Sequence, residues 1–390
     1  MKRIFIPAII TVLVLTVSSC EESIHSVSKR VFERARVQYT AMDKRMAPDS
    51  LPRTFREGKY VNADIRWWCS GFIAGTYWYI FDYTRDPEME VLARNYTHRL
   101  DSICLKKTHH DIGFQVNCSF GNAYRITGED LWLEVMEKAA AKLAGRYSPV
   151  VKAIKSWDNK KYVYPVIIDN MMNLELLVKG AGLFGADSLK EIACTHANTT
   201  IANHFRPDFS TWHLVDYNPE SGEVDHKQTV QGYSDDSAWS RGQAWGLYGY
   251  TMMYRYTGEA AYLEQATHIA RFILGRLPED GIPAWDFDAP SDENGVLLRD
   301  ASAGAIMACA FAELGTCVQD SKLAKRCIAT AKRQVRTLSS PEYLAEPGEN
   351  GDFLLKHSVG SLPGNSEVDV PLTYADYYFL EALLRLEGRL

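Results

Sequence analysis

The stretch YRITGEDLWLE, at Tyr124–Glu134, decides the fold, because it returns 130 residues later as YRYTGEAAYLE, at Tyr254–Glu264. Each copy joins the end of one apolar helical pattern to the start of the next. The glycine in the turn favours a helix end, and the acidic residues after it favour the first turn of a new helix. The repeated segment therefore predicts a hairpin of two helices.

Weaker copies of this turn begin at Tyr83, at Phe184 and near Leu314, so the turn recurs every 40 to 70 residues. Such a period is typical of an array of helical hairpins. Helical periodicity is clear in Leu131–Leu143 and Ala260–Leu274, whereas alternating strand patterns are few and short. We expect an all-α fold in which about six hairpins close into an (α/α)6 barrel with a pocket at one end. An open superhelix is the alternative, and the moderate length of the chain favours closure.

The N-terminus has the pattern of an export signal. Two basic residues precede the apolar stretch Ile4–Val17, which is too short for a convincing membrane span. The stretch ends in VSSC, a pattern that resembles the bacterial lipobox, in which the cysteine receives the lipid. We expect residues 1–19 to be a lipoprotein signal peptide, Cys20 to carry the lipid, and residues 20–390 to form a single catalytic domain. The protein would then be an exported lipoprotein, periplasmic or anchored to the outer membrane; an ordinary signal peptide that contains a cysteine is the alternative.

Composition narrows the class of protein. The chain is 46% hydrophobic and 12% aromatic, which is enough for a sizeable core and argues against disorder. Its formal net charge of −6 and the lack of a run rich in Lys and Arg argue against a nucleic-acid partner. Besides Cys20 there are seven cysteines, with neither a CxxC pair nor the Cys/His spacing of a zinc site. The cysteines therefore give no metal site, and any disulfide among them stays unassigned.

Two aspartates are the candidate catalytic residues. Asp111 stands in HHDIGF, and Asp169 stands in VIIDNMMN. Each lies in or beside an apolar run, where an ionised carboxylate is costly without partners and where its pKa can rise into the range useful for acid/base catalysis. A structural role, such as a helix cap, is the alternative for either one. His109 and His110 before Asp111 could suggest a metal, but adjacent side chains on a helix diverge and no third ligand is apparent.

Aromatic and polar segments supply candidate binding residues. Trp68, in WWCSGF, could stack on a sugar or pack in the core. His213 and Gln231 lie in segments that predict a polar loop or a short hairpin between helices. His213 could be a neutral hydrogen-bond donor, a general acid, or simply an exposed residue.

Arg241 and Trp245 are four residues apart and so share one face of a predicted helix. Asp236 or Ser237 could cap that helix. The arginine could form a bidentate pair with a substrate carboxylate while the indole packs against the sugar. The alternative is an arginine that binds the acidic cap.

Taken together, seven segments resemble the unsaturated glucuronyl hydrolases of glycoside hydrolase family 88, and the resemblance covers the chain from about residue 30 to 390. The segments are Trp68–Phe72, His110–Phe114, Ile168–Asn173, Trp212–His213, Gln231–Gly232, Ser240–Trp245 and Trp285–Phe287. Each alone is weak, and their combination is specific. The fold of that family is an (α/α)6 barrel, in line with the repeated turn.

The resemblance implies a reaction and roles for the candidate residues. The family acts on oligosaccharides left by polysaccharide lyases, which carry a Δ4,5-unsaturated uronic acid at the non-reducing end. Asp169 would protonate C4 and then activate the water that attacks C5, while Asp111 would bind ring hydroxyls and tune Asp169. Six further residues match positions that contact substrate, and no metal or organic cofactor is implied. These are Trp68, His110, His213, Gln231, Arg241 and Trp245, of which Arg241 or a neighbour would handle the uronate carboxylate.

The expected substrates are glycosaminoglycan fragments of the chondroitin, hyaluronan or heparin type. Some relatives read sulfate with a loop containing Ser and Lys near the C-terminus, but the matching stretch here, Ser358–Pro363, lacks the lysine. Three other functions remain open. The related unsaturated rhamnogalacturonyl hydrolases take pectin fragments by the same chemistry. A sugar epimerase on a similar barrel would use histidines, which the two aspartates argue against, and a non-catalytic lipoprotein could merely bind glycans.

Overall fold

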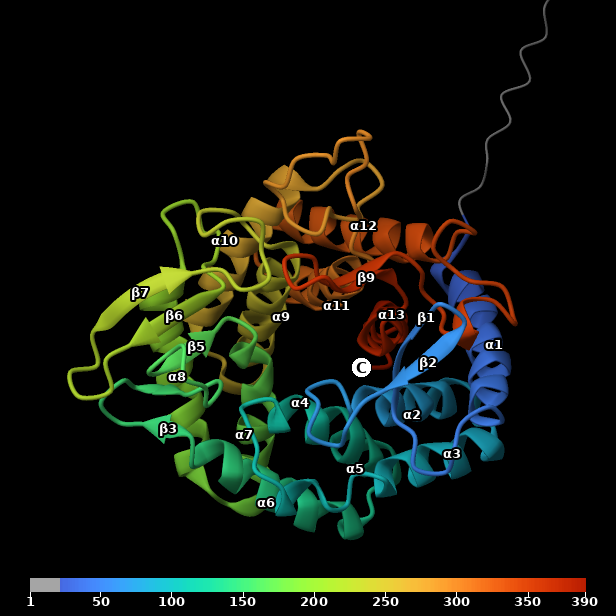
Figure 1. Cartoon of the computed structure of the whole chain (residues 1–390), viewed down its shortest axis with the longest axis horizontal. Coiled ribbons are helices and arrows are strands. Elements are labelled where there is room, and N and C mark those ends of the chain that lie inside the picture. Colours follow the sequence, from blue (N-terminus) through green and yellow to red (C-terminus); the bar gives the residue numbers. More distant parts are fainter. Residues whose placement is uncertain (1–21) are drawn as a thin grey trace, which may run out of the picture.

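A ring of six inner helices forms the centre of the computed structural model, which describes residues 22–390. In chain order α13 returns to pack on α2, so the ring is closed (Figure 1). This closure confirms the (α/α)6 barrel and rules out the open superhelix. The inner helices are α2 (Phe72–Thr84), α4 (Ile112–Val116) with its continuation α5 (Asn122–Thr127), α7 (Asn170–Phe184), α9 (Ser240–Thr257), α11 (Ala301–Cys317) and α13 (Thr373–Leu386). A π-helical turn, Asn117–Gly121, joins α4 to α5.

A second ring of helices surrounds the first. Each outer helix turns one apolar side inward and polar residues outward, whereas α11 is buried along almost its whole length. A helix that is apolar all round belongs inside a protein, and one with a single apolar side belongs at its surface. The outer helices are α1 (Ile24–Asp43), α3 (Pro87–His98), α6 (Leu133–Ala144), α8 (Asp187–His204), α10 (Ala260–Arg276) and α12 (Ser321–Leu338).

The repeated turn found in the sequence links an inner helix to the next outer one in all five of its copies, as predicted. In three copies a glycine in the left-handed region ends the inner helix: Gly128 at φ 68°, Gly185 at φ 64° and Gly258 at φ 71°. All five turns lie at the same end of the barrel, which we call the C-terminal mouth because the inner helices end there. The opposite end, the N-terminal mouth, gathers the starts of the inner helices.

Short antiparallel strands decorate the longer loops of the N-terminal mouth. Their sheets are formed by β1 (Pro52–Arg56) with β2 (Lys59–Asn62), β3 (Tyr147–Ser148) with β4 (Ala153–Ile154), β5 (Pro165–Ile167) with β6 (Leu214–Tyr217) and β7 (Val224–Gln228), and β8 (Ser358–Ser361) with β9 (Ser366–Val370). The hairpin predicted after His213 is therefore confirmed as β6 and β7. Three 3-10 turns, Ile103–Leu105, Asp130–Trp132 and Asn350–Asp352, complete the elements.

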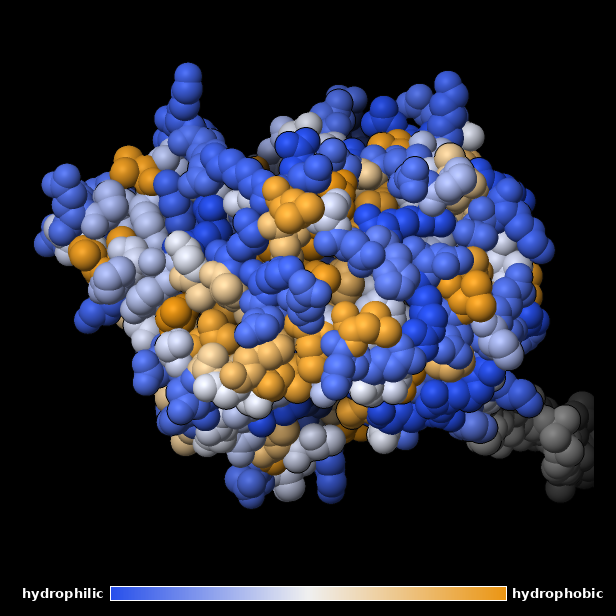
Figure 2. All heavy atoms as spheres, turned by 90° about the horizontal axis from the view of Figure 1, so that it is seen from below, coloured by the Kyte–Doolittle hydropathy of each residue, from blue (hydrophilic) through white to orange (hydrophobic). Residues whose placement is uncertain are grey.

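The outer surface carries mixed character. Figure 2 shows one side of the barrel, where apolar patches are interrupted by polar residues. Within residues 22–390, no helix combines the length and the apolar character needed to cross a bilayer. The predicted signal peptide and Cys20 lie outside the described residues.

Candidate active site

The N-terminal mouth gathers functional side chains at the starts of the inner helices. Asp111 immediately precedes α4, Asp169 immediately precedes α7, and Arg241 is the second residue of α9. Each helix start carries a partial positive charge from its free N–H groups, which favours nearby anions. The barrel therefore directs several such charges at one pocket.

Neither aspartate serves as a helix cap. Asp111 and Asp169 occupy the N-cap positions of α4 and α7, but the side chain of neither accepts a hydrogen bond from its helix. Asp300, by contrast, does cap α11, accepting a 3.0 Å hydrogen bond from the Ser302 N–H. The alternative of a structural cap therefore fails for both candidate catalytic residues.

The sheet of β5, β6 and β7 positions Asp169. Ile167 pairs with Leu214, and the Ile168 N–H donates to the His213 carbonyl at 3.0 Å, so Asp169 and His213 are brought together. The Asp169 side chain is 14% exposed. Burial raises its pKa to about 7; nearby Arg241 opposes that rise, and the Asp111 charge adds to it. Asp169 can therefore hold a proton near neutral pH, as the sequence predicted.

Asp111 is in the opposite state. His109 Nδ1 lies 2.9 Å and His110 Nε2 lies 3.2 Å from its Oδ2, and the Asn173 amide donates to Oδ1 at 3.5 Å. Burial alone would raise the pKa of Asp111, but His110 and His109 outweigh it and hold this pKa well below the usual range. The expectation of a raised pKa is wrong for Asp111, because its partners are closer than the apolar sequence around it suggested. The pair thus combines a protonatable carboxyl with a permanent anion.

His213 is a neutral hydrogen-bond donor. Its Nδ1 accepts from the backbone N–H groups of Val230 at 3.0 Å and Gln231 at 3.2 Å, so the ring proton resides on Nε2. That Nε2 lies 3.8 Å from Asp169 Oδ2. Burial, assisted by the Arg241 charge, lowers the pKa of His213 to about 3. Of the three roles left open by the sequence, the structure selects the neutral donor.

Arg241 is buried and bound to the protein. Its Nη1 donates to Asp300 Oδ2 at 2.9 Å and to the Val359 carbonyl, and its Nη2 donates to the Gly360 carbonyl. Gln231 Nε2 donates to the same Gly360 carbonyl at 3.0 Å. Both side chains therefore hold the β8–β9 hairpin against the mouth. A contact of Arg241 with the uronate carboxylate stays a prediction.

The start of α9 differs from the prediction. Neither Asp236 nor Ser237 caps this helix, which begins at Ser240 with Trp239 at its N-cap. Trp239 pairs with Asp286 through an isolated β-bridge, and this extended backbone delays the helix. Ser237 instead donates to Asp286 Oδ2 at 2.7 Å.

The two predicted tryptophans belong to one aromatic cluster. The Trp68 ring lies 4.6 Å from the Tyr374 ring and 5.7 Å from the Phe114 ring, and it remains partly exposed. Trp245 is fully buried with its ring 5.2 Å from Phe114. Trp68 can therefore present a face to a sugar, whereas Trp245 packs in the core and presents only its N–H toward Asp169, whose pKa it lowers.

Unpartnered polar atoms mark the pocket. Buried donors and acceptors without a partner are rare, because each is costly to the folded state. Within residues 22–390, such atoms include His110 Nε2, Asp169 Oδ2, His213 Nε2, Trp245 Nε1 and the Tyr374 hydroxyl. His110 Nε2 is near Asp111 but poorly aligned for a hydrogen bond, and Trp245 Nε1 is similarly placed beside Asp169. Their gathering around the two aspartates is the property expected of a pocket that binds a polyhydroxylated ligand.

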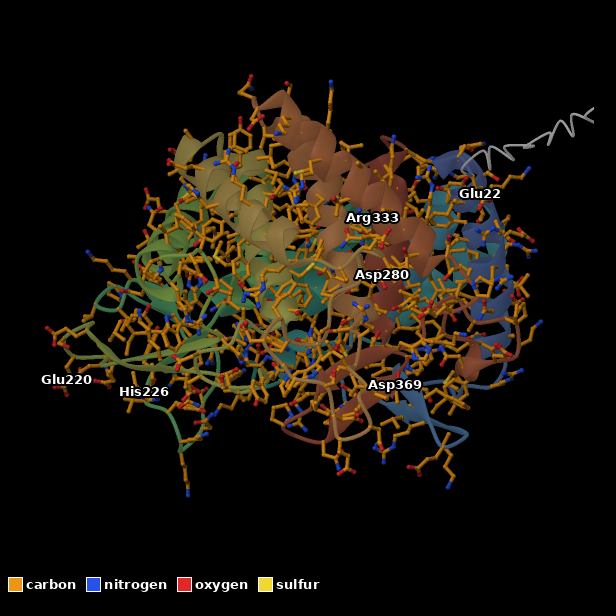
Figure 3. All side chains as sticks on the ribbon, turned by 90° about the horizontal axis from the view of Figure 1, so that it is seen from above. Glu22, Glu220, His226, Asp280, Arg333 and Asp369 are labelled. Carbon is orange, nitrogen blue, oxygen red and sulfur yellow. The ribbon has the colours of Figure 1, made fainter. Side chains whose placement is uncertain are left out.

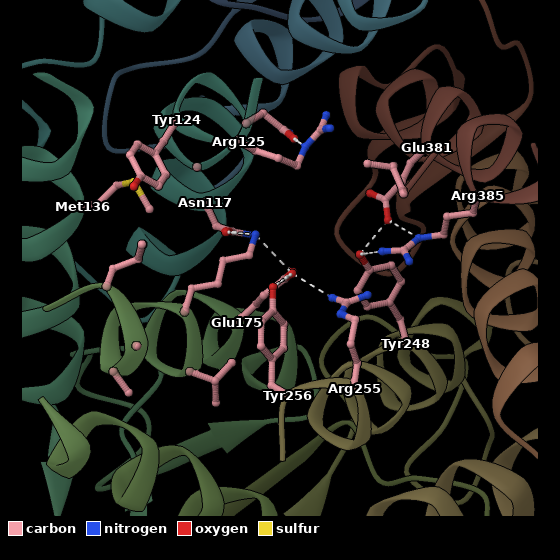
Figure 4. A pocket seen from close by; sticks show the side chains of 18 of the residues that line it. Asn117, Tyr124, Arg125, Met136, Glu175, Tyr248, Arg255, Tyr256, Glu381 and Arg385 are labelled. Carbon is pink, nitrogen blue, oxygen red and sulfur yellow. Dashed lines mark hydrogen bonds and ion pairs between the residues drawn. The ribbon is translucent and has the colours of Figure 1, made fainter. Parts of the chain in front are cut away.

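The largest cavity lies elsewhere, at the C-terminal mouth. It encloses about 920 Å³ and is lined by side chains such as Tyr124, Glu175 and Arg255 (Figure 4). Glu175 binds Arg255 at 2.8 Å and Asn117 at 3.1 Å. None of the unpartnered buried atoms of the described chain lies on this lining. Size alone therefore does not identify the catalytic pocket, and the polar groups of this cavity satisfy one another.

Metal and sulfur chemistry find no support in the described part of the chain. It contains no group of three His, Cys, Asp or Glu side chains placed to hold a metal ion. Its seven cysteines are all free. The disulfide left open by the sequence is therefore not formed among them.

Five residues of the site were absent from the predicted set: Asn173, Trp157, Trp239, Asp300 and Tyr374. Asn173 follows Asp169 by one helical turn, so helix geometry could have identified it. The Trp157 ring lies 6.5 Å from the His110 ring, and the Trp239 ring lies 4.6 Å from that of His213. A lone tryptophan in a loop carries no signal of its own. Asp300 and Tyr374 reach the site only through the closure of the barrel.

Comparison with known proteins gives close relatives. The chain is 43% identical over 326 residues, 82% of this chain and 80% of the relative, to an unsaturated glucuronyl hydrolase from Formosa agariphila. It is 32% identical to an unsaturated chondroitin disaccharide hydrolase from Streptococcus pyogenes, over 85% of this chain and 84% of the relative. A crystal structure of an unsaturated glucuronyl hydrolase specific for heparin matches with a TM-score of 0.89 at 44% identity, covering 93% of this chain and 97% of the other.

No protein-family model matches the chain. The identity to the relatives nevertheless extends over more than four fifths of its length, and the barrels superimpose throughout. This chain therefore belongs to the unsaturated glucuronyl hydrolases, glycoside hydrolase family 88.

Proposed function

We propose that this enzyme releases the Δ4,5-unsaturated uronic acid from the non-reducing end of glycosaminoglycan oligosaccharides that lyases have produced. The observation that carries the proposal is the pair of aspartates with split protonation. Asp169 has a pKa of about 7, and Asp111 is held ionised beside it. A group that must first give and then take a proton needs a pKa near the working pH.

The reaction begins on the protonated Asp169. Its proton adds to C4 of the enol ether, and the electron pair of the C4=C5 bond forms the new C–H bond, leaving positive charge shared by C5 and the ring oxygen. The Asp169 carboxylate then takes a proton from a water molecule while the water oxygen bonds to C5. The resulting hemiketal opens, and the remaining sugar departs from C1. The net change is addition of one water, so the spacing rule for carboxylates that act at the anomeric carbon does not apply.

Other residues support this sequence of steps. The Asp111 anion sits where it can accept hydrogen bonds from ring hydroxyls, and its charge helps keep the Asp169 pKa high. The His213 Nε2–H is a donor that stays neutral throughout. The helix starts of the N-terminal mouth favour the uronate carboxylate. Trp68 offers a ring face to the apolar side of a sugar.

The choice of a glycosaminoglycan follows the relatives, one of which is named for chondroitin and another for heparin. The Ser358–Pro363 stretch forms β8 and the turn after it, next to Arg241 and Gln231 at the mouth. It has no lysine, so we do not extend the proposal to a particular sulfation pattern.

A panel of lyase-generated disaccharides tests the proposal. Hydration removes the conjugated double bond, so turnover appears as loss of its ultraviolet absorbance. We expect turnover of at least one chondroitin, hyaluronan or heparin disaccharide and none of a rhamnogalacturonan disaccharide. The reverse pattern would assign the enzyme to pectin fragments. Binding without any turnover would make it a glycan-binding protein.

We also propose that the protein is an exported lipoprotein anchored through Cys20, with residues 1–19 removed. The support is the basic start, the short apolar stretch and the VSSC pattern. Incorporation of labelled palmitate by the wild-type chain, and its loss in Cys20→Ala, would test this. Absence of label from the wild type would refute it.

A further inference from the structure

Helix α12 is the most basic segment of the surface. Between Ser321 and Leu338 it carries six basic side chains and no acidic one, although the whole chain has a net charge of −6. Its apolar residues, such as Leu323 and Val335, are buried against the barrel. The basic residues are Lys322, Lys325, Arg326, Lys332, Arg333 and Arg336.

Most of these charges are not used within the protein. Arg326 donates to the Leu274 carbonyl at 2.7 Å, and Arg336 donates to the Glu22 carbonyl at 3.1 Å. Among the described residues no carboxylate lies within ion-pair distance of Lys322, Lys325 or Lys332. Lys322 and Lys325 are exposed, and Lys332 is half-buried. A fixed row of unpaired cations is the pattern expected of a surface that meets anions.

The chain enters the fold on this same face. Arg336 contacts Glu22, and Arg30 of α1 binds the Glu22 carboxylate at 2.9 Å. Figure 3 shows α12 across this side of the barrel, with Arg333 near its middle and Glu22 at the edge. Lys29 and Arg30 extend the basic surface onto α1.

The sequence leaves little slack before this point. Only Glu21 separates Glu22 from Cys20. Two extended residues span about 7 Å, so a lipid on Cys20 would hold Glu22 at the bilayer surface. The face around Glu22 must then also lie there, because it belongs to a rigid barrel.

We propose that α12 and the start of α1 form the face by which this protein lies on a leaflet of anionic phospholipids. The inference rests on the proposed lipid anchor and is independent of the hydrolase chemistry. Basic residues next to an anchor strengthen its attachment to anionic headgroups, and one acyl signal often needs such a second one. Because α12 belongs to the outer ring, contact through it covers neither mouth of the barrel. The N-terminal mouth stays open to soluble oligosaccharides.

Lysine footprinting on the lipidated, full mature protein tests this orientation. The protein is reconstituted on vesicles of phosphatidylcholine with phosphatidylglycerol, and each lysine's reaction with a water-soluble acylating reagent is measured by mass spectrometry. We expect the reactivity of Lys322, Lys325 and Lys332 to fall about fivefold relative to detergent solution, and to recover in high salt. Lys160, before β5, and Lys190, on α8, serve as matched controls and should not change. Equal protection of both sets, or none, would overturn the proposal.

Two further arms separate the alternatives. A triple variant, Lys322→Gln, Lys325→Gln and Lys332→Gln, should keep full activity on the disaccharide substrate while its vesicle-bound orientation becomes random, seen as loss of protection at Lys29. Retained protection of Lys29 would contradict a role for α12. Heparin added without vesicles tests a polysaccharide as the occupant; protection by heparin but not by vesicles would reject the membrane. If the disaccharide assay fails while the footprint holds, the proposed activity is wrong and the docking face stands.

Discussion

His213 Nε2 lies 3.8 Å from Asp169 Oδ2, and the ring is held in that position by two backbone N–H groups on its other nitrogen. The backbone of Val230 and Gln231 thus decides which nitrogen carries the proton. A donor fixed in this way needs no reorganisation when charge develops on a substrate oxygen nearby. Two substitutions separate the two nitrogens.

His213→Asn should lower kcat about 100-fold while leaving the fold intact. The Asn side-chain oxygen can replace Nδ1 as acceptor for the two N–H groups, whereas the donor toward Asp169 is lost. His213→Gln should do the opposite, restoring a donor and lowering the thermal stability. Steady-state kinetics and thermal unfolding of the two variants provide the measurement. Full kcat in His213→Asn would show that the donor is not used.

The pH profile of kcat should follow Asp169. The acid must be protonated to donate to C4, so kcat should fall as the pH rises through about 7. Asp111 raises this pKa through its charge, so Asp111→Asn should move the falling limb to lower pH as well as reduce the rate. Asp187→Asn, at the start of α8 away from the site, is the control and should leave the limb in place. A limb that stays put in Asp111→Asn would contradict the coupling.

Asp169→Asn should stabilise the protein at alkaline pH. The folded pKa of about 7 exceeds the ordinary 3.8, so the folded chain retains a proton that the unfolded chain has lost. The stability linked to that proton is fully present below about pH 4 and is lost as the pH rises through 7. The amide avoids this loss, so the variant should be more stable by up to about 4 kcal/mol at pH 8 and equal at pH 4. Denaturant unfolding at both pH values measures it, and a pH-independent difference would refute the raised pKa.

Gly113→Ala should disrupt the site. A Cβ at this position would lie 2.6 Å from the Asn173 Cα, and backbone cannot yield as a flexible side chain can. The change would push α4 away from α7, separate Asp111 from Asn173, and reduce both kcat and stability. Gly182→Ala is the matched control in α7, because a Cβ there meets nothing within 4 Å. It should stabilise the helix by about 0.5–1 kcal/mol with normal activity. Equal effects of the two changes would show that the close approach does not matter.

Much of the architecture was predictable because the chain repeats its inner-to-outer turn. A turn such as Tyr124–Gly128 needs only local residues, and its recurrence indicates how many hairpins there are. The short sheets were less visible, since β5 joins β6 across 46 intervening residues, from 168 to 213. That pairing, invisible to local patterns, is what places Asp169 beside His213.

The candidate site divides in the same way. Asp169 behaves as its apolar sequence predicts, because burial dominates its pKa. Asp111 does not, because His109 and His110 turn toward it instead of diverging. Arg241 was expected to face substrate, yet its partner Asp300 comes from the next inner helix, 59 residues later. Contacts made by ring closure cannot be read from any one segment.

The central claim is that Asp169 carries the proton to C4, and turnover by Asp169→Asn on a matched lyase-generated disaccharide tests it most directly. The double-bond absorbance should persist over many wild-type turnover times, while calorimetry shows that the disaccharide still binds. If the absorbance disappears at the wild-type rate, another group supplies the proton and the account is wrong.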